Sequence, residues 1–161
     1  MVPTNILNCC PGKDEARCWR ALVVDDMPEA RRLTSMLLSA LGGQVTTAAN
    51  GTEAVEIVHL VGERKIGFDL IVTAIQMPVM NGIEATRRMR GRGFDGPIIA
   101  VSRSGRSLIR DMCLAAGCDE FVCEPVSLEN LASIVQRYCQ TWTAQSDLRE
   151  CMSTAATVAV H

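Results

Sequence analysis

Acidic and hydroxyl side chains stand where several apolar runs of this sequence end. Asp25 and Asp26 close the run "RALVVDD", Ser102 closes "GPIIAVS", and Glu124 follows "EFVC" directly before a proline. Carboxylate oxygens are ligands that Mg²⁺ prefers, although carboxylates alone are a permissive signal for a metal. If these runs are neighbouring strands, their ends form one acidic pocket.

A further run, "DLIVTAI", reaches the same kind of position without a reactive group. Ala74 offers only a methyl group, which has no lone pair and cannot act as a nucleophile. Asp69 does not replace it, because five residues of extended strand put that carboxylate about 16 Å away, at the opposite end of the run. The pocket therefore lacks an acceptor carboxylate at this position.

Three carboxylates without a cation between them repel one another in surroundings of reduced dielectric constant. One carboxyl could keep its proton, or a metal ion could bind to the acid pair and the backbone carbonyl of Gln76, with Glu124 as an added ligand. Loss of a carboxylate at Ala74 would weaken such a site. Alternatively, Arg103 could lie over the pocket and pair with Glu124 or Asp26, or it could be a solvated loop charge.

Five apolar runs alternate with five helical patterns along the chain. The predicted strands cover residues 20–26, 44–49, 69–75, 96–102 and 120–125, and the predicted helices cover 28–41, 52–61, 81–90, 107–117 and 127–142. Short connections in this order indicate an α/β fold, a single-domain doubly wound sheet of five parallel strands with helices on both faces. Ligands of such folds bind at the carboxyl ends of the strands.

Two of the predicted helices carry more specific expectations. The first helix should face the core with Ala30, Leu33, Leu37 and Leu41, because these positions recur at helical spacing. Thr52 should cap the second helix, since its hydroxyl can accept a backbone N–H at a helix start.

The composition is that of one folded domain. The chain has 161 residues, 48% of them hydrophobic, and a formal net charge of -2. We expect a flexible N-terminal arm at 1–19, the domain at 20–143, and a weakly structured tail at 144–161 that is too short for an effector domain. No apolar run approaches the ~20 residues of a membrane span and no signal peptide is found, so we expect a cytoplasmic protein.

Eight cysteines require an interpretation. They are Cys9, Cys10, Cys18, Cys113, Cys118, Cys123, Cys139 and Cys151. None lies in the paired CxxC or CxxH spacing that is typical of zinc sites. We expect reduced thiols that mostly behave as small buried hydrophobes, with Cys9 and Cys10 as the exposed exceptions.

Four motifs resemble the receiver domain of response regulators, the CheY-like family. They are "VVDD", "DLIVTAIQMPVMNG", "PIIAVS" and "EFVCEPV", in family order over roughly residues 20–141. The resemblance implies a flavodoxin-like fold and a phosphorylation site with five parts. These are an acid pair that helps to hold Mg²⁺, an acceptor aspartate, a hydroxyl, a lysine and an aromatic residue. By position they correspond to Asp25 with Asp26, Ala74, Ser102, Glu124 and Phe121.

Two positions depart from the family pattern. Ala74 replaces the acceptor aspartate, and Glu124 replaces the lysine and reverses the charge that would face a phosphate. The two lysines of the chain, Lys13 and Lys65, both precede the run that ends at Ala74, so neither supplies the missing cation. We expect a degenerate pseudo-receiver that has lost aspartyl phosphorylation. An engineered Asp-to-Ala form of a phosphorylatable regulator is the alternative, but it leaves Glu124 unexplained; a weak divalent-metal-binding receiver is another.

The resemblance implies a protein-interaction module of two-component signalling. An enzyme is not expected, because neither His59 nor His161 stands at a strand end and no nucleophile–base pair can be assembled. We expect phosphorylation-independent binding to a histidine kinase or another regulator, or a homodimer through the fourth helix, fifth strand and fifth helix.

The arginine-rich stretch "RRMRGRG" has a second interpretation as a nucleic-acid patch. Cations at a helix C-terminus are favoured by the helix dipole, which explains the stretch without a ligand. The acidic net charge and the lack of any DNA-binding motif argue against nucleic acid as a partner.

Overall fold

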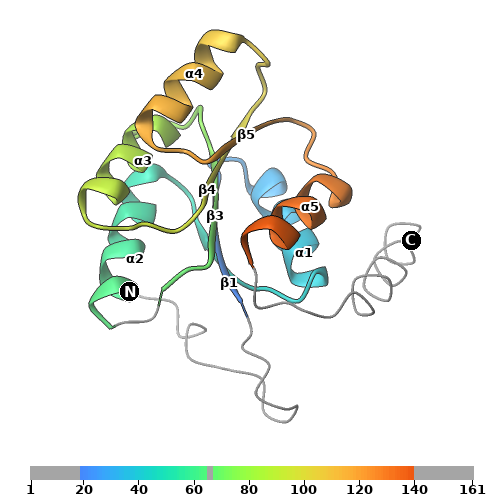
Figure 1. The fold of residues 1–161 in the computed structure, drawn as a ribbon, viewed down its shortest axis with the longest axis horizontal. Coiled ribbons are helices and arrows are strands. Elements are labelled where there is room, and N and C mark those ends of the chain that lie inside the picture. Colours follow the sequence, from blue (N-terminus) through green and yellow to red (C-terminus); the bar gives the residue numbers. More distant parts are fainter. Residues whose placement is uncertain (1–18, 65–66, 140–161) are drawn as a thin grey trace.

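Strands and helices alternate along the chain (Figure 1). The strands are β1 (Arg20–Val24), β2 (Gln44–Ala48), β3 (Leu70–Ala74), β4 (Ile98–Ser102) and β5 (Glu120–Cys123). The helices are α1 (Pro28–Ala40), α2 (Gly51–Glu63), α3 (Gly82–Gly91), α4 (Ser107–Ala116) and α5 (Leu128–Tyr138). The computed structural model describes residues 19–64 and 67–139. The predicted arm and tail lie outside these ranges.

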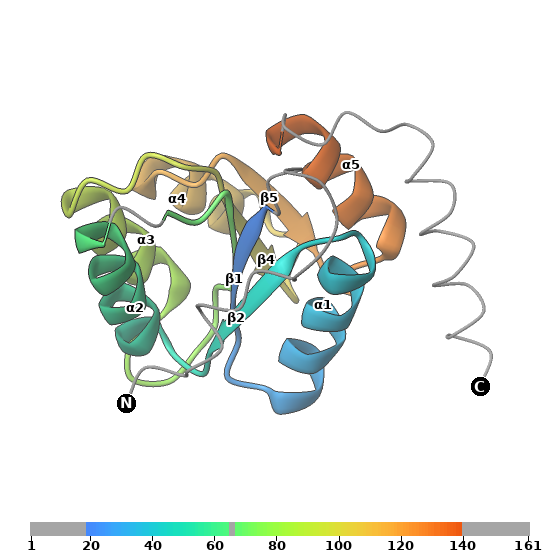
Figure 2. The same ribbon diagram turned by 90° about the horizontal axis from the view of Figure 1, so that it is seen from below.

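The five strands form one parallel sheet in the order β2-β1-β3-β4-β5. Figure 2 shows α2, α3 and α4 on one side of the sheet and α1 and α5 on the other. The predicted doubly wound α/β fold is therefore confirmed. All carboxyl ends of the strands lie at one edge of the sheet, which we call the carboxyl edge, and all amino ends lie at the opposite, amino edge.

Short polar side chains begin three of the helices. Asn50 and Asn81 each accept the backbone N–H of a glutamate three residues later, and Ser127 does the same for Asn130. These contacts satisfy backbone donors that have no partner within the helix. Thr52 was the wrong residue for the cap of α2, because the helix begins two residues earlier at the Asn50 cap.

Two apolar layers fill the two sides of the sheet. One gathers residues of α2, α3 and α4, including Val55, Ile83 and Met89, and the other gathers residues of α1 and α5, including Leu38 and Leu131. The strands contribute alternate side chains to each layer, as the pleat requires. The strands β3 and β4 are buried along their whole length, which explains why each has only one polar residue, Thr73 and Ser102.

The expected inward face of α1 was partly wrong. Leu33 is 53% exposed, whereas Leu38 and Leu41 are fully buried. α1 packs on the sheet through these two leucines and Leu37, near its C-terminal end. Its N-terminal part, which carries Leu33, instead borders the carboxyl edge.

A network around Arg90 holds the amino ends of β4 and β5. The guanidinium donates to the carbonyl oxygens of Phe94, Gly96 and Gly117, and to the Asp119 carboxylate at 2.8 Å. The Asp119 carboxylate also accepts the N–H of Ile98, the first residue of β4. This Arg90 network ties the loop after α3 to the turn before β5.

Three of the described cysteines are buried free thiols. Burial raises the pKa of Cys113 to about 11 and that of Cys139 to about 12, and it also raises the pKa of Cys118. Cys123 is exposed. Cys9 and Cys10 lie outside the described residues. None of the described helices is long and apolar enough to cross a membrane.

Candidate functional site

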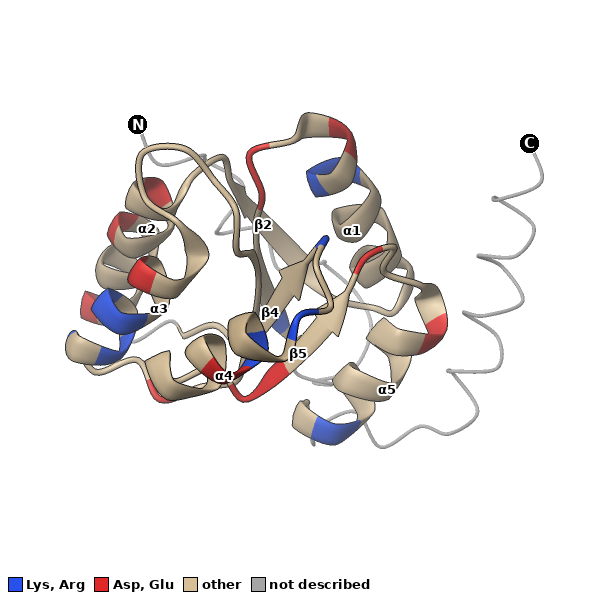
Figure 3. Ribbon diagram, turned by 90° about the horizontal axis from the view of Figure 1, so that it is seen from above, with Lys and Arg blue, Asp and Glu red and all other residues tan. Residues whose placement is uncertain are grey.

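The carboxyl edge brings the predicted site residues together. Asp25 and Asp26 lie between β1 and α1, in the acidic segment that Figure 3 shows in red before α1. Ala74 and Ser102 are the last residues of β3 and β4, and Glu124 follows β5. The sheet order places β3 between β1 and β4, so Ala74 stands at the centre of this group.

Asp25 is the most enclosed acid of the site, with an exposed fraction of 7%. Its Oδ1 accepts the backbone N–H of Met27 at 2.9 Å, and its backbone carbonyl accepts a hydrogen bond from Arg31. Burial raises the pKa of the Asp25 carboxyl, the Met27 N–H opposes that shift, and the neighbouring Asp26 charge adds to it. The protein therefore holds this carboxylate at an electrostatic cost.

Asp26 faces a different space. Its Oδ1 is buried and has no hydrogen-bond partner within the described part of the chain. It borders a hollow of about 430 Å³ that Gln76, Met77, Asn81 and Arg103 also line. An orphaned acceptor beside a hollow leaves room for a donor or a cation.

Arg103 bridges this hollow and Glu124. Its Nε lies 3.7 Å from Glu124 Oε2, and its Nη2 donates to the sulfur of Met27 at 2.8 Å. The Arg103 side chain is 53% exposed, so solvent screens the pair. Of the two partners considered for Arg103, the structure pairs it with Glu124; the contact is long and half exposed.

The hydroxyl and aromatic positions of the family motif, Ser102 and Phe121, make contacts within the protein itself. Ser102 is 2% exposed, and its Oγ accepts the backbone N–H of Ser104 at 3.0 Å. Phe121 is half-buried and packs against the layer formed by α2, α3 and α4. Both side chains therefore have a structural role in this conformation.

The backbone around Ala74 is closely packed. Gly82, the first residue of α3, lies so near that a Cβ atom there would collide with the Ala74 carbonyl oxygen. The Gly82 N–H also donates to the Ile75 carbonyl at 2.8 Å. In the loop between Ile75 and Gly82, Val79 has φ 69°, which is an unfavourable conformation for a β-branched residue. Its side chain is 89% exposed. On the side-chain face of Ala74, in contrast, there is free space, because the side chain is only a methyl group.

That space is a cavity of about 140 Å³ between α1 and the carboxyl ends of the central strands. Its lining includes Asp25, Ala74 and Glu124, together with apolar side chains of β3, β4 and α1. We call it the Asp25 cavity. This cavity was not predicted from the sequence, because Leu33, which borders it, was expected in the core.

The acid pair fits a metal ion only in part. The orphaned Oδ1 of Asp26 and the nearby Gln76 are compatible with Mg²⁺ ligation. However, residues 19–64 and 67–139 contain no group of three His, Cys, Asp or Glu side chains that could hold a metal. Glu124 therefore does not join Asp25 and Asp26 as a third carboxylate ligand in this conformation.

Met27 is the site residue that sequence reasoning missed. Its N–H binds Asp25 and its sulfur accepts from Arg103, so it connects the acid pair to the loop after β4. Its position directly after the acid pair was a usable signal for the backbone contact. The sulfur contact depends on how two loops meet and has no signal in the sequence.

Comparison with known proteins places this geometry in a family. A family model for the response regulator receiver domain matches residues 21–136. The chain is 40% identical over 121 residues to the two-component response regulator ORR41 of Oryza sativa subsp. japonica, and the match covers 74% of this chain and 93% of that protein. Among the curated sensor histidine kinases that it matches, the chain spans 12 to 14% of their length.

Two solved structures illustrate the similarity. One is the receiver domain of a sensor histidine kinase from Pseudomonas aeruginosa PAO1 with magnesium in the active site cleft, at 30% identity and TM-score 0.67, covering 75% of this chain and 97% of that one. The other is an Asp-to-Ala mutant of the receiver domain of the histidine kinase CKI1 from Arabidopsis thaliana, at 34% identity and TM-score 0.66, covering 74% and 88%. This chain belongs to the family of response regulator receiver domains.

Proposed function

We propose that this receiver acts without aspartyl phosphorylation, as a cytoplasmic protein-interaction module of two-component signalling. The observation that carries the proposal is Ala74 at the end of β3, in the centre of the carboxyl edge. A methyl group cannot attack a phosphoryl donor. Asp69 offers no substitute, since it lies before β3 at the amino edge, where its Oδ2 accepts the Arg20 N–H.

The surroundings of Ala74 support the same proposal. Glu124 stands where the family pattern has a lysine, and Arg103 is paired with Glu124 at 3.7 Å. An incoming phosphoryl group would meet the carboxylates of Asp25, Asp26 and Glu124. Like charges at such distances oppose binding, and a half-exposed guanidinium compensates only weakly.

A phosphorylation assay tests this proposal. The full chain is incubated with acetyl phosphate and Mg²⁺, and its intact mass is measured at intervals. We expect no phosphoryl adduct on the wild type and an adduct on the double variant Ala74→Asp with Glu124→Lys. The single variant Ala74→Asp separates the contribution of the lysine. A wild-type adduct mapped to Asp25 or Asp26 would overturn the proposal.

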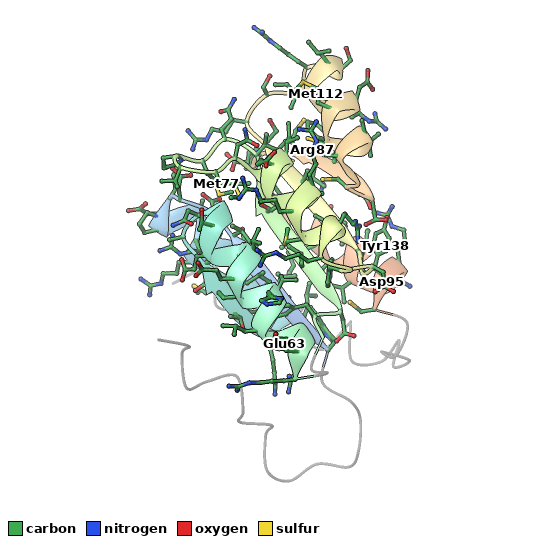
Figure 4. All side chains as sticks on the ribbon, turned by 90° about the vertical axis from the view of Figure 1, so that its left-hand side faces the viewer. Glu63, Met77, Arg87, Asp95, Met112 and Tyr138 are labelled. Carbon is green, nitrogen blue, oxygen red and sulfur yellow. The ribbon has the colours of Figure 1, made fainter. Side chains whose placement is uncertain are left out.

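The surface of α4, β5 and α5 is the interaction face that we propose. Leu108 is 69% exposed and Met112 45% exposed; one turn of helix separates them, so they share one side of α4. Figure 4 labels Met112 on this helix. Exposed Arg106 and Arg110 flank the two apolar residues. A histidine kinase, another regulator or a second copy with apolar and acidic side chains would match this face.

On α5 the face continues with a polar contact. Arg137 Nη2 lies 3.0 Å from Glu120 Oε1, and both side chains line a shallow groove of about 310 Å³ beside β5. The other Glu120 oxygen, Oε2, is buried, and burial together with the Glu120 charge raises the pKa of the nearby Tyr138 hydroxyl. The polar groups of this groove are therefore shared between β5 and α5.

Affinity capture from the source cell tests the interaction face. Three baits are compared: the wild type, the double variant Leu108→Asp with Met112→Asp, and the control Leu60→Asp, which alters an exposed leucine on α2. We expect the face variant to lose its partner and the control to keep it. The rebuilt variant Ala74→Asp with Glu124→Lys shows whether phosphorylation gates the same contact. Equal capture by the wild type and the face variant would contradict the assignment of this interaction face. Sedimentation velocity on the same proteins tests for self-association.

We also propose that Mg²⁺ binds weakly here. Asp25, Asp26 and the backbone carbonyl of Gln76 remain as ligands, but the carboxylate of the acceptor position is absent. Mg²⁺ sites usually use one or two carboxylates and several waters. We expect Ala74→Asp to tighten Mg²⁺ binding by at least about tenfold, as one added ligand interaction of about 1.4 kcal/mol would. Equal affinities of the variant and the wild type would contradict this.

A further inference from the structure

The Asp25 cavity has acidic side chains set among apolar walls. Two carboxylates, Asp25 and Glu124, and one hydroxyl-bearing residue, Thr34, are its polar lining, and no lysine or arginine lines it. The remaining walls are apolar, with Leu33, Val72 and Val101 among them. A ligand of this cavity would therefore combine a positive charge with an apolar body.

Asp25 presents an incompletely bonded oxygen there. The residue is 93% buried, since its exposed fraction is 7%, and only its Oδ1 has a hydrogen-bond donor, the Met27 N–H. No residue of the described ranges donates to Oδ2, and this oxygen is not one of the fully enclosed atoms without a partner, so solvent or a ligand can reach it. Because the residue as a whole has little contact with water, a ligand that supplies N–H groups gains more here than at the open surface.

The neighbouring arginines neutralise the cavity only in part. Arg31 donates to the backbone carbonyl of Asp25 and not to its carboxylate, and burial raises the pKa of that carboxyl more than the charges of Arg103 and Arg31 lower it. Arg103 borders the hollow on the Asp26 side and reaches Glu124 only at 3.7 Å with a half-exposed side chain. Both carboxylates of the cavity therefore retain attraction for a further cation.

The size of the cavity limits that cation. About 140 Å³ is close to the roughly 150 Å³ of an engineered apolar cavity that takes up benzene. A hydrated Mg²⁺ ion would gain nothing from the apolar walls, because it keeps its waters. A short alkyl chain fits such walls, and a terminal ammonium brings three donors for carboxylate and hydroxyl oxygens.

We propose that the Asp25 cavity is a binding site for a primary alkylammonium group, with the ammonium at Asp25 and Glu124 and the alkyl chain against Val72 and Val101. Ala74 makes this site possible, because its methyl group leaves the centre of the cavity open. The inference is independent of the interaction face on α4 and α5 and would survive its failure. The ammonium could belong to a free amine or to a lysine side chain of a partner, which present the same group.

The first experiment titrates n-butylammonium chloride into the full ¹⁵N-labelled chain and follows backbone amide shifts by NMR. We expect saturable shifts at residues around the cavity, with a Kd on the order of 1 mM, which is within the binding limit for a ligand of so few atoms. The neutral isostere n-butanol should bind at least about tenfold more weakly, and sodium chloride at equal ionic strength should cause no such shifts.

Two substitutions at one position separate charge from shape. Glu124→Gln keeps the shape and removes one charge, and should weaken n-butylammonium binding about fivefold to tenfold. Glu124→Lys supplies an ammonium within the chain and should abolish binding. Glu129→Gln, an exposed acid on α5 outside the cavity, is the matched control and should bind as the wild type does. Far-UV circular dichroism verifies that each variant is folded.

Three results would contradict the proposed ammonium site. Equal binding of n-butanol and n-butylammonium would mean an apolar cavity without cation selectivity, and unchanged affinity in Glu124→Gln would remove the assigned carboxylate. Absence of saturable shifts would remove the site. A parallel titration with Nα-acetyl-lysine-methylamide identifies the source: affinity similar to n-butylammonium supports a partner lysine, and loss of affinity supports a free amine in the same cavity.

Discussion

The arginines at the two edges of the sheet differ in their hydrogen bonds and in their exposure. At the amino edge, Arg90 makes five hydrogen bonds with a side chain that is 23% exposed. At the carboxyl edge, Arg103 is 53% exposed, donates to a thioether sulfur and reaches its carboxylate only at 3.7 Å. Asp119 has two donors at one oxygen, whereas Asp26 has a buried oxygen with none in the described chain.

The comparison distinguishes hydrogen bonds that stabilise the fold from polar groups that remain open to a ligand or partner. The Arg90 network satisfies carbonyl groups that would otherwise be buried without donors, so its loss would disturb the backbone. The amino edge also holds buried atoms without a partner in the described chain, Arg20 Nη1 and Glu120 Oε2, but only the carboxyl edge combines such an atom, Asp26 Oδ1, with an acidic cavity and a neighbouring hollow. Such groups are retained where a ligand or partner can use them, or where selection has relaxed.

The largest effect is expected at the amino edge. Arg90→Ala removes all five hydrogen bonds, several of them to half-buried carbonyl oxygens, and we expect the free energy of unfolding to fall by about 3 kcal/mol. Urea denaturation measures it. Arg88→Ala is the control on the same helix; Arg88 pairs with Glu84 at the surface, so we expect a loss below about 0.5 kcal/mol. Similar losses in both variants would erase the contrast between the edges.

Relief of backbone strain should stabilise the carboxyl edge. Val79 has φ 69° and is 89% exposed, so its side chain contributes little packing. Val79→Asn places a residue that tolerates this conformation, and we expect a gain of about 1 kcal/mol in urea denaturation. Val79→Ala removes only the β-branch and should give a smaller gain. A loss in both variants would mean that Val79 makes stabilising contacts.

Asp25→Asn tests the electrostatic cost of the enclosed acid. Burial raises the pKa of Asp25 above its ordinary value of 3.8, so the folded protein binds this proton more tightly than the unfolded chain does. Wild-type stability therefore falls as pH rises through 3.8 toward the folded-state pKa. Asparagine still accepts the Met27 N–H. We expect a gain at pH 7, smaller than that at Val79, and none near pH 3.

The pH dependence of this gain is its check. Asp111→Asn, which alters an exposed acid on α4, should show no gain at either pH. A gain for Asp25→Asn that is equal at both pH values would point to packing instead of charge.

The smallest effect is expected for Arg103→Ala. Its pair with Glu124 is long and half exposed, so we expect a loss of stability below about 0.5 kcal/mol at neutral pH, measured by thermal or urea denaturation. A loss above about 1 kcal/mol would show that the pair fixes the site, and would make the two edges alike. High salt should change the wild type and the variant by similar amounts.

The sequence predicted the fold better than it predicted the site. All ten elements follow from apolar runs, helical spacing and glycine or asparagine punctuation, because burial on a sheet imposes a pattern on each element separately. The strand ends likewise predicted which residues meet at the carboxyl edge, since parallel strands share one direction.

The errors concern where elements face and how loops meet. Leu33 has the right spacing for the core, but α1 packs on the sheet near its C-terminal end and leaves this residue at the rim of a cavity. Thr52 and Asn50 are both capping residues, and only the local backbone decides between them. The Met27–Arg103 contact joins two loops 76 residues apart, for which no local pattern exists.

The position of β1 has a consequence for how the domain opens. β1 pairs with β2 and β3, so residues 20 to 74 form three adjacent strands, and β4 and β5 extend this unit on one side only. β5 is an edge strand of four residues with one neighbour. Amide hydrogens of β5 should therefore exchange faster than those of β1 and β3, through local opening that leaves the rest of the sheet intact. A partner that binds α4, β5 and α5 would slow this exchange, so a weakly protected edge strand of the sheet would also report binding.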